Sequence, residues 1–342
     1  MSAMELAFII DPPEKLAAYK DSSVAMMRSA AARGHHLWII ERASLLWQDG
    51  GRGFAEHRSA PDAGTRLCKA ESGVATVFAR ARRIAVSESN SLWFSVLEEA
   101  VRPLRDYSAV LMRQDPPFDM EYVAATWLLQ RAEAEGARIF NRPQAIRDHS
   151  EKLALCEFAE FAPTTRVART AADVQAFIDE FKDVVIKPLD GMGGAGVFRI
   201  RHDEPNRNVI VETVTALGSR SVMVQRYLPE VTAGDKRVLI IGGQVVPWGL
   251  ARIPQGGELR GNLAAGGKGV AQPLTPRERQ IADCLAPTLW ARGLFIVGLD
   301  MIGERLTEIN VTSPTCFVEI SQHSGIDVAG LAIAALEKEC TG

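Results

Sequence analysis

The chain has little of what would place it in a specialised class of protein. It has five cysteines in 342 residues, at positions 68, 156, 284, 316 and 340, and no Cys-x-x-Cys pair. This odd, scattered set argues against a disulfide framework, a zinc ribbon or a redox motif, and it is typical of a reducing cytoplasm. Basic residues number 39 against 42 acidic ones. The chain therefore has no basic surplus for sequence-independent binding of nucleic acid.

Long hydrophobic runs are also missing. The longest, such as residues 6–10 and 295–299, are far too short to span a bilayer. The N-terminus has no basic segment before its first apolar run and reaches Asp11-Pro12-Pro13 at once, which is not the pattern of a signal peptide. We therefore expect a cytoplasmic protein with no membrane partner.

What is present is an ordinary globular composition, with 47% hydrophobic and 24% charged residues. Apolar runs alternate with helical patterns over the first 140 residues, which predicts an open, mainly parallel α/β domain. We expect strands at 6–10, 37–40, 109–112 and 138–140. Helices are expected at 22–33, capped by Ser22 or Ser23, and from Asp119 to about Glu135. Residues 48–100 look irregular.

The pattern changes near Arg142-Pro143, where helices begin to mix with strands that look antiparallel. We expect an N-terminal domain over 4–145 and an α+β domain over 146–342. Strands are predicted at 184–189, 197–201 and 244–253, and a hairpin at 295–302 and 306–311 around Gly303-Glu304.

A glycine-rich loop joins two of these strands. It contains Gly191, Gly193 and Gly196 in the spacing G-x-G-x-x-G, with Gly194 between them. A dinucleotide fingerprint would need a helix directly after the loop, whereas the next residues alternate like a strand. Glycines between two strands can close their backbone N–H groups over phosphates. A plain structural turn is the alternative.

Lys187 lies among apolar neighbours on the strand before this loop. A buried lysine is costly without an anion, so we expect a nucleotide phosphate beside it. An ion pair with a core carboxylate is the alternative.

Asp300, Glu308 and Asn310 form a second constellation on the predicted hairpin. Glu308 and Asn310 are two residues apart and therefore share a face of their strand. Asp300 can join them only if the connection has an odd length or the hairpin contains a bulge, and we predict one of these. Three oxygen donors suit a hard cation that is shared with phosphates. Solvated edge residues are the alternative.

A long glycine-rich stretch follows the strand at 244–253. Residues 254–269 contain few bulky apolar side chains, yet the segment carries Arg260 and Lys268, with Arg252 just before it. A mobile cover over a polyanionic intermediate would need this composition. A plain flexible loop is the alternative.

Three smaller features complete the candidates. Asp21 and Ser22 stand at a helix start, where free N–H groups favour a carboxylate, and Arg113 ends a strand at the edge where open α/β sheets bind ligands. A simple cap and a surface arginine are the alternatives. No histidine partner is evident for Cys316, which we interpret as a packing residue rather than a nucleophile.

Taken together, these residues resemble one known family. The segments "MRQDPPFD", "KDSS", "KPLDGMGGAGVFR", "ARIPQGGELRGNLAAGGKG" and "GLDMIGERLTEINVTSPT" are similar to those of prokaryotic glutathione synthetase, an ATP-grasp ligase. The resemblance covers nearly the whole chain. It departs from the family at Gln114, where lysine is usual, and at Arg226, where asparagine is usual.

The resemblance implies an ATP-grasp domain over 146–342, with a central lobe at about 150–225, a C-terminal lobe at about 226–342 and a lid at 254–269. It implies ATP-driven joining of γ-glutamylcysteine to glycine with Mg²⁺, or alternatively Mn²⁺, in a homotetramer. Nucleotide binding would then fall to Lys152, Lys187, Gly191, Gly193, Gly194, Gln225, Arg226, Tyr227, Leu228 and Asp235. Arg237, Arg252 and Asn262 would serve catalysis, and Asp21, Ser22, Arg113, Arg260, Ser313 and Thr315 the peptide substrate. Asp300, Glu308 and Asn310 would hold the metal.

The chemistry of such a ligase is consistent with the residues. A carboxylate becomes reactive towards an amine once it is phosphorylated, and the protein then has to position and neutralise charge rather than supply a nucleophile. A phosphotransferase that uses the same nucleotide site, or a ligase for a related dipeptide, is the second interpretation. A nicotinamide oxidoreductase would rest on the glycine spacing alone.

Overall fold

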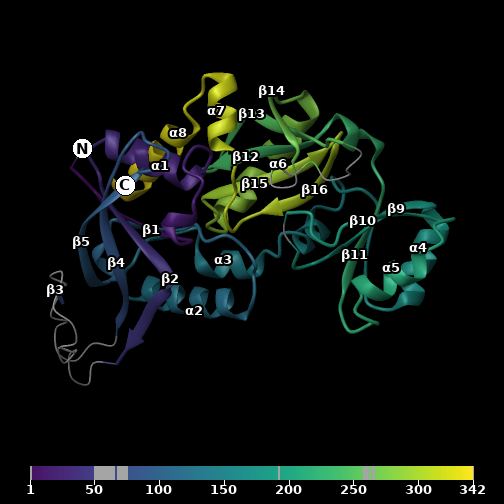
Figure 1. Ribbon diagram of the computed structural model, residues 1–342, viewed down its shortest axis with the longest axis horizontal. Helices are drawn as coiled ribbons and strands as arrows, with labels where there is room; N and C mark the ends of the chain where they lie inside the picture. The colour runs from purple at the N-terminus through teal and green to yellow at the C-terminus, as the bar shows by residue number, and fades with distance from the viewer. Residues whose placement is uncertain are drawn as a thin grey trace.

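The computed structural model describes residues 2–49, 66–67, 76–191, 193–256, 261, 263 and 266–341. Its strands form three sheets of seven, four and five strands. Figure 1 shows the seven-stranded sheet on one side, the four-stranded sheet on the other, and the five-stranded sheet above and between them. No helix among the described residues has the length and apolar character needed to cross a membrane.

The seven-stranded sheet has the order β3-β5-β4-β2-β1-β6-β7. Its strands are β1 (Glu5–Ile10), β2 (His36–Gln48), β3 (Arg66–Leu67), β4 (Thr76–Val86), β5 (Phe94–Pro103), β6 (Ala109–Met112) and β7 (Ile139–Phe140). Its helices are α1 (Ser22–Ala32), α2 (Met120–Ala134) and α3 (Pro143–Asp148), and the short η1 (Pro13–Lys15) and η2 (Leu104–Asp106) join them. The predicted parallel core is confirmed, because β1, β2, β6 and β7 all pair in parallel.

Two expectations about this region were wrong. The stretch 48–100 is not irregular throughout, since β4 and β5 form a long antiparallel pair that continues the sheet from β2. The first half of β5 is exposed, and its residues 95–99 neither alternate nor form a continuous apolar run, so the sequence does not reveal a strand here. The N-cap of α1 is Asp21, whose side chain accepts a hydrogen bond from the Val24 N–H, and not Ser22 or Ser23. Both serines are buried, because tertiary partners use their hydroxyls.

The four-stranded sheet carries the glycine loop. It consists of β8 (Thr165–Ala168), β9 (Asp183–Pro188), β10 (Phe198–Arg201) and β11 (Val222–Arg226), all antiparallel. Helices α4 (Ala171–Phe181) and α5 (Arg207–Val214) pack with the sheet in a small core of their own. The short helix η3 (Leu153–Phe158) lies between α3 and β8.

The five-stranded antiparallel sheet has the order β14-β13-β12-β15-β16. Its strands are β12 (Asp235–Ile241), β13 (Gln244–Ile253), β14 (Lys268–Pro273), β15 (Ile296–Ile302) and β16 (Arg305–Asn310). The elements around it are η4 (Pro229–Ala233), α6 (Pro276–Ala291), α7 (Phe317–Ser324) and α8 (Val328–Thr341). Strand β13 has the bounds predicted for it, and the second half of the chain is antiparallel as expected.

Helix α8 crosses back to the N-terminal sheet. Its Val328, Ile333 and Leu336 belong to the same hydrophobic core as Phe8 and Met27. At the rim of this core the buried Glu337 carboxylate contacts Nε2 of His35 at 2.9 Å and Nη1 of Arg33 at 2.8 Å. Segments near the two ends of the chain therefore share one hydrophobic core. Figure 1 shows α1 and α8 side by side.

Candidate functional site

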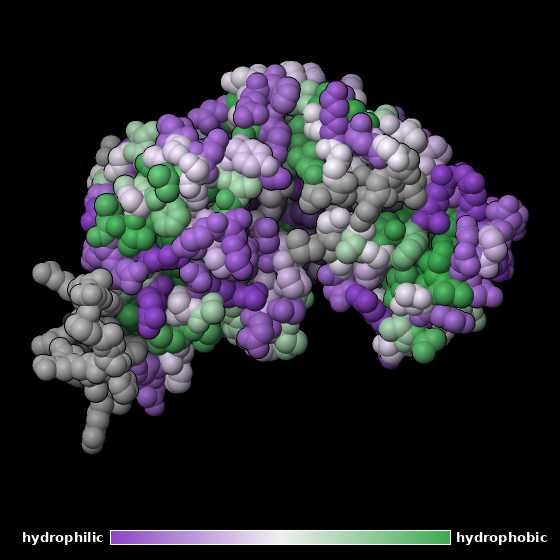
Figure 2. Space-filling model, viewed as in Figure 1, coloured by the Kyte–Doolittle hydropathy of each residue, from purple (hydrophilic) through white to green (hydrophobic). Residues whose placement is uncertain are grey.

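A cavity of about 380 Å³ lies where the four-stranded and five-stranded sheets meet. Figure 2 shows the surface hollowed between the lobe that carries α4 and α5 and the rest of the molecule. The cavity is lined by Lys152, Lys187, Gly191, Gly193, Gly194, Gln225, Arg226, Tyr227, Leu228, Asp235, Arg237, Arg252, Asp300, Glu308, Asn310, Ser313 and Thr315. The structure thus brings together most of the candidate residues from both halves of the ATP-grasp-like region.

On the side of the four-stranded sheet, Lys187 is a buried cation in β9. It is 9% exposed, and among the described residues its Nζ has one hydrogen-bond partner, the Thr307 carbonyl at 3.2 Å. Burial lowers the pKa of Lys187, although Glu308 acts in the opposite direction. The alternative, a core ion pair, is therefore not what holds this ammonium among the described residues. Its free donors suit an anionic ligand.

Lys152 links this wall to the hairpin. Its Nζ donates to the Gly191 carbonyl at 2.7 Å and lies 2.8 Å from Oε1 of Glu308. The glycine loop has strand β10 after it and no helix, which excludes the dinucleotide fingerprint. Gly193 and Gly194 have φ of +61° and +79°, a region that favours glycine, and a Cβ on Gly191 would lie 2.9 Å from the Pro188 ring. The residue between Gly191 and Gly193 lies outside the described part of the chain.

The end of β11 and the two residues after it line one end of the cavity. Gln225 is buried and donates to the Thr165 hydroxyl at 3.0 Å, whereas the Arg226 side chain is exposed. The Tyr227 ring lies under the Arg199 guanidinium at 3.6 Å, and Arg199 in turn makes two hydrogen bonds to Asp183. The apolar side chains that line the cavity here, among them Leu228, suit a planar base.

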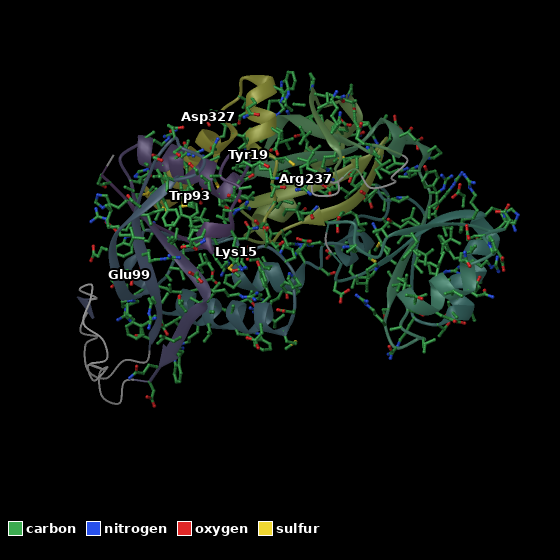
Figure 3. The ribbon with its side chains drawn as sticks, viewed as in Figure 1. Lys15, Tyr19, Trp93, Glu99, Arg237 and Asp327 are labelled. Atoms are coloured by element: carbon green, nitrogen blue, oxygen red, sulfur yellow. The ribbon has the colours of Figure 1, made fainter. Side chains whose placement is uncertain are left out.

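On the side of the five-stranded sheet, two arginines and two carboxylates are already paired. Arg237 contacts Oδ1 of Asp300 at 2.5 Å, and Nη2 of Arg252 lies 2.6 Å from Asp235 and 2.9 Å from Asp300. Figure 3 shows Arg237 near the middle of the molecule, among the strands of this sheet. Burial alone would raise the pKa of Asp300, but the two arginines lower it. Burial, together with the charge of Asp300, raises the pKa of Asp235 to about 6.

The hairpin carries the expected metal-type donors. Ile302 pairs with Arg305 across a two-residue loop, and a register shift between Asp300 and Met301 brings Asp300 opposite Glu308. The predicted bulge is therefore confirmed. Nδ2 of Asn310 donates to the Gly298 carbonyl at 3.3 Å. The described residues contain no cluster of three or more His, Cys, Asp or Glu side chains arranged for a metal, so a cation here would need oxygen atoms from Asn310 and a ligand.

Of the residues expected to bind the peptide, Ser313 and Thr315 line the cavity, and Arg113 contacts the residue between them. Arg113 is buried, and it donates from Nε to the Ser23 hydroxyl at 3.2 Å and from Nη2 to the Pro314 carbonyl at 2.7 Å. Its Nη1 has no partner among the described residues. Ser22 accepts from the Phe317 N–H at 3.3 Å, so the start of α1 and the start of α7 are tied together. Gln114, where the family usually has lysine, bonds to Asp11.

Two candidates, Arg260 and Asn262, fall outside the described residues, together with part of the predicted lid at 254–269. Gly261 is described and lines the cavity. A Cβ there would lie 2.1 Å from the Arg252 carbonyl oxygen, so only glycine allows the chain to pass this close.

Sequence reasoning did not select five of the polar residues that line the cavity: Asp115, Glu151, Arg199, Thr307 and Thr312. All except Glu151 lie inside motifs that carried the resemblance, so the family motifs could have identified them. Glu151 precedes Lys152, but nothing local shows that its carboxylate accepts hydrogen bonds from Val311 and Thr312, 160 and 161 residues away. Cys316 is buried, and burial raises the pKa of its thiol, which agrees with a packing role.

Comparison with known proteins finds the same family for both halves of the chain. The family models for the prokaryotic glutathione synthetase N-terminal domain and ATP-grasp domain match residues 4–147 and 151–325. The glutathione synthetase of Ralstonia nicotianae is 50% identical over 335 residues, covering 98% of this chain and 96% of that protein. That of Nitrosomonas europaea is 48% identical, with 98% of each chain covered. Among solved structures, the D-cycloserine synthetase DcsG superposes with a TM-score of 0.64, and the match covers 98% of this chain and 99% of that one. At 16% sequence identity this similarity shows the fold alone.

Proposed function

The chain belongs to the prokaryotic glutathione synthetases, which are ATP-grasp ligases, and from this premise we propose that its central cavity is the place where ATP, γ-glutamylcysteine and glycine meet. The enzyme joins γ-glutamylcysteine to glycine and forms glutathione, ADP and phosphate. One observation supports this location of the reaction above the others. Lys152, Lys187 and Glu308 come from three separate segments and converge on one cavity beside a glycine loop.

We propose that the four-stranded and five-stranded sheets have different roles in the reaction. Lys152, Lys187 and the glycine loop bind the phosphates, and residues 225–228 with Asp235 hold the base and ribose. Arg237 and Arg252 neutralise the charge that develops as the γ-phosphoryl group moves to the cysteinyl carboxylate of the dipeptide. The glycine amine then attacks the acyl phosphate, a new C–N bond forms, and phosphate leaves. Arg113, Asp21, Ser22, Ser313 and Thr315 hold the dipeptide.

We propose that Asp300, Glu308 and Asn310 would hold the divalent cation, Mg²⁺ or Mn²⁺, which would neutralise the charge of the phosphates. The donors fit this role, because two carboxylates and an amide oxygen leave coordination positions for phosphate. In the structure, however, Asp300 is paired with two arginines and Glu308 with Lys152. Binding would therefore exchange partners: the acids would turn to the cation and the basic side chains to the phosphates.

We also propose the finer features that the resemblance implies. These are an N-terminal substrate-side domain over 4–145 and an ATP-grasp domain over 146–342. They include a cytoplasmic homotetramer that acts on small molecules and binds no nucleic acid or membrane. Light scattering coupled to size-exclusion chromatography tests the tetramer directly. A monomer at micromolar concentration would contradict it.

The test of the reaction uses purified protein with ATP, Mg²⁺, γ-glutamylcysteine and glycine. We expect ADP and glutathione to appear in equal amounts, and neither to appear without the dipeptide. ADP that forms without glutathione would instead identify a phosphotransferase, and replacement of γ-glutamylcysteine by related dipeptides measures how strictly the site selects its substrate. Replacement of Mg²⁺ by Mn²⁺ distinguishes the two cations.

A further inference from the structure

Strand β16, which carries Glu308 and Asn310, lies at the edge of its sheet. One side of an edge strand has backbone groups without a neighbouring strand, so other parts of the chain must hold it in place. Here the Leu306 N–H donates to the Phe161 carbonyl at 2.9 Å, and the Ile309 N–H donates to the Glu151 carbonyl at 2.9 Å. The segment from Glu151 to Phe161 thus runs along the free edge of β16.

The Glu151 side chain continues this contact one step further along the strand. Its Oε1 accepts from the Val311 N–H at 3.1 Å, the Thr312 N–H at 3.3 Å and the Thr312 hydroxyl at 2.8 Å. In a strand the N–H groups of residues 309 and 311 point the same way. Glu151 therefore accepts from both N–H groups: its backbone carbonyl binds that of residue 309, and its carboxylate binds that of residue 311.

The Val311 carbonyl is held from the other side by Asn141. The buried Asn141 carboxamide donates from Nδ2 to the carbonyls of Val311 and Ile296, both at 2.8 Å. Its Oδ1 accepts from the N–H groups of Phe295 at 2.6 Å and Ile296 at 2.8 Å. Both backbone groups of Val311, the residue after Asn310, are thus fixed by side chains from the segment that joins the two halves of the protein.

We propose that Glu151 is a positioning residue for the cation site, and that it acts by holding residues 309–312 so that Glu308 and Asn310 face the phosphates. This proposal rests on the metal site proposed above. Glu151 lines the cavity, but the three hydrogen bonds that its carboxylate accepts among the described residues come from Val311 and Thr312, directly after β16. We therefore expect that the position of this acceptor oxygen, rather than the negative charge, keeps residues 309–312 in place.

A series of substitutions separates position from charge. Glu151→Gln keeps an acceptor oxygen at the same reach and removes the charge, Glu151→Asp keeps the charge and shortens the reach, and Glu151→Ala removes both. Loss of a group that orients a metal ligand typically lowers metal affinity about 10- to 100-fold. We expect that loss for the Ala and Asp variants, and at most about a threefold change for Gln.

The measurement is Mn²⁺ binding by titration calorimetry in the presence of a non-hydrolysable ATP analogue, together with the Mg²⁺ dependence of glutathione formation. The matched control is Glu157→Gln, an exposed acid on the same segment that pairs with Arg292 at 2.6 Å. We expect this variant to bind Mn²⁺ like the unmodified enzyme. Thr312→Val removes only the hydroxyl donor to Glu151 and should shift Mn²⁺ affinity a few-fold in the same direction, so the series stays decisive even if Glu151→Ala does not fold.

Two results would overturn the proposal. The first is unchanged Mn²⁺ affinity in the Asp, Ala and Thr312→Val variants, and the second is a Gln variant as impaired as Ala, which would assign the role to charge. If the unmodified enzyme itself shows no dependence on a divalent cation, the proposed metal site fails instead. The two failures are therefore distinguishable.

Discussion

The two walls of the cavity, formed by the four-stranded and the five-stranded sheet, differ in whether their buried cations are paired with acidic side chains. On the four-stranded sheet, Lys187 is buried with a single carbonyl partner among the described residues. On the five-stranded sheet, Arg237 and Arg252 are equally buried but paired with Asp300 and Asp235. A buried ammonium with no ion pair among the described residues is suited to an anionic ligand, whereas the two arginines already have acidic partners in the fold. Replacing a cation should therefore have different consequences on the two walls.

The largest effect on stability should follow a change on the paired wall. In Arg252→Met, Asp235 and Asp300 lose a buried partner, which typically costs about 3–5 kcal/mol in the free energy of unfolding. Urea denaturation measures this loss. The control is Arg279→Met, whose exposed helical pair with Asp283 contributes at most about 0.5 kcal/mol. A loss below about 1 kcal/mol for Arg252→Met, the range of an exposed pair, would show that the two walls are not different.

On the other wall, Lys187→Met should affect turnover instead. Removal of one preorganised electrostatic contact lowers the rate by roughly 100- to 1000-fold. The unfolding free energy should change by no more than about 1 kcal/mol, because the buried charge and its single hydrogen bond disappear together. Steady-state kinetics and urea denaturation on the same preparation test both parts. A variant that is active, or one that is unstable, contradicts the assignment.

The pH dependence of stability should report Asp235. Its pKa is raised to about 6 by burial and by Asp300, so the folded state retains a proton that the unfolded state releases near the ordinary value of 3.8. The stabilisation is complete below about pH 4 and is lost as the pH rises towards 6, with a slope of about 1.4 kcal/mol per pH unit. Asp235→Asn resembles the protonated form. The stability of the unmodified protein relative to this variant should therefore fall across that window, and parallel curves would contradict the prediction.

The smallest effect should come from Cys316, which lies on the paired wall near both arginines. If it only packs, Cys316→Ala removes one buried sulfur atom and costs about 1 kcal/mol in stability. Glutathione formation should stay within about threefold of the original rate. Loss of turnover by more than about a hundredfold would show that the thiol takes part in the reaction.

The sequence predicted local features well and long-range ones poorly. The predicted bounds of β13 match the structure, spacing placed Glu308 and Asn310 on one face, and the argument from register predicted an odd loop or the observed bulge at Asp300. Each of these depends on a few neighbouring residues. The metal-type donors and Lys187 could therefore be selected from the amino-acid sequence alone.

The residues that sequence reasoning missed depend on contacts across the chain. Glu151 and Asn141 matter because β16 lies at the edge of a sheet, which no local pattern reveals. Ser22 and Ser23 have the composition of a helix cap, but Phe317 and Arg113 occupy their hydroxyls. Half of strand β5 is exposed and mixes apolar with acidic residues, so it lacked the alternating pattern of a half-buried strand.

The packing of α8 against the N-terminal sheet has a consequence for how the protein is made. His35 and Glu337 are 302 residues apart, so a ribosome that adds about 5–20 residues per second needs about 15–60 s to deliver the second after the first. Until then Phe8 and Met27 lack the apolar helix that covers them in the finished molecule. The nascent N-terminal domain therefore presents an open hydrophobic face throughout synthesis, and its final closure is coupled to the arrival of the ligase domain.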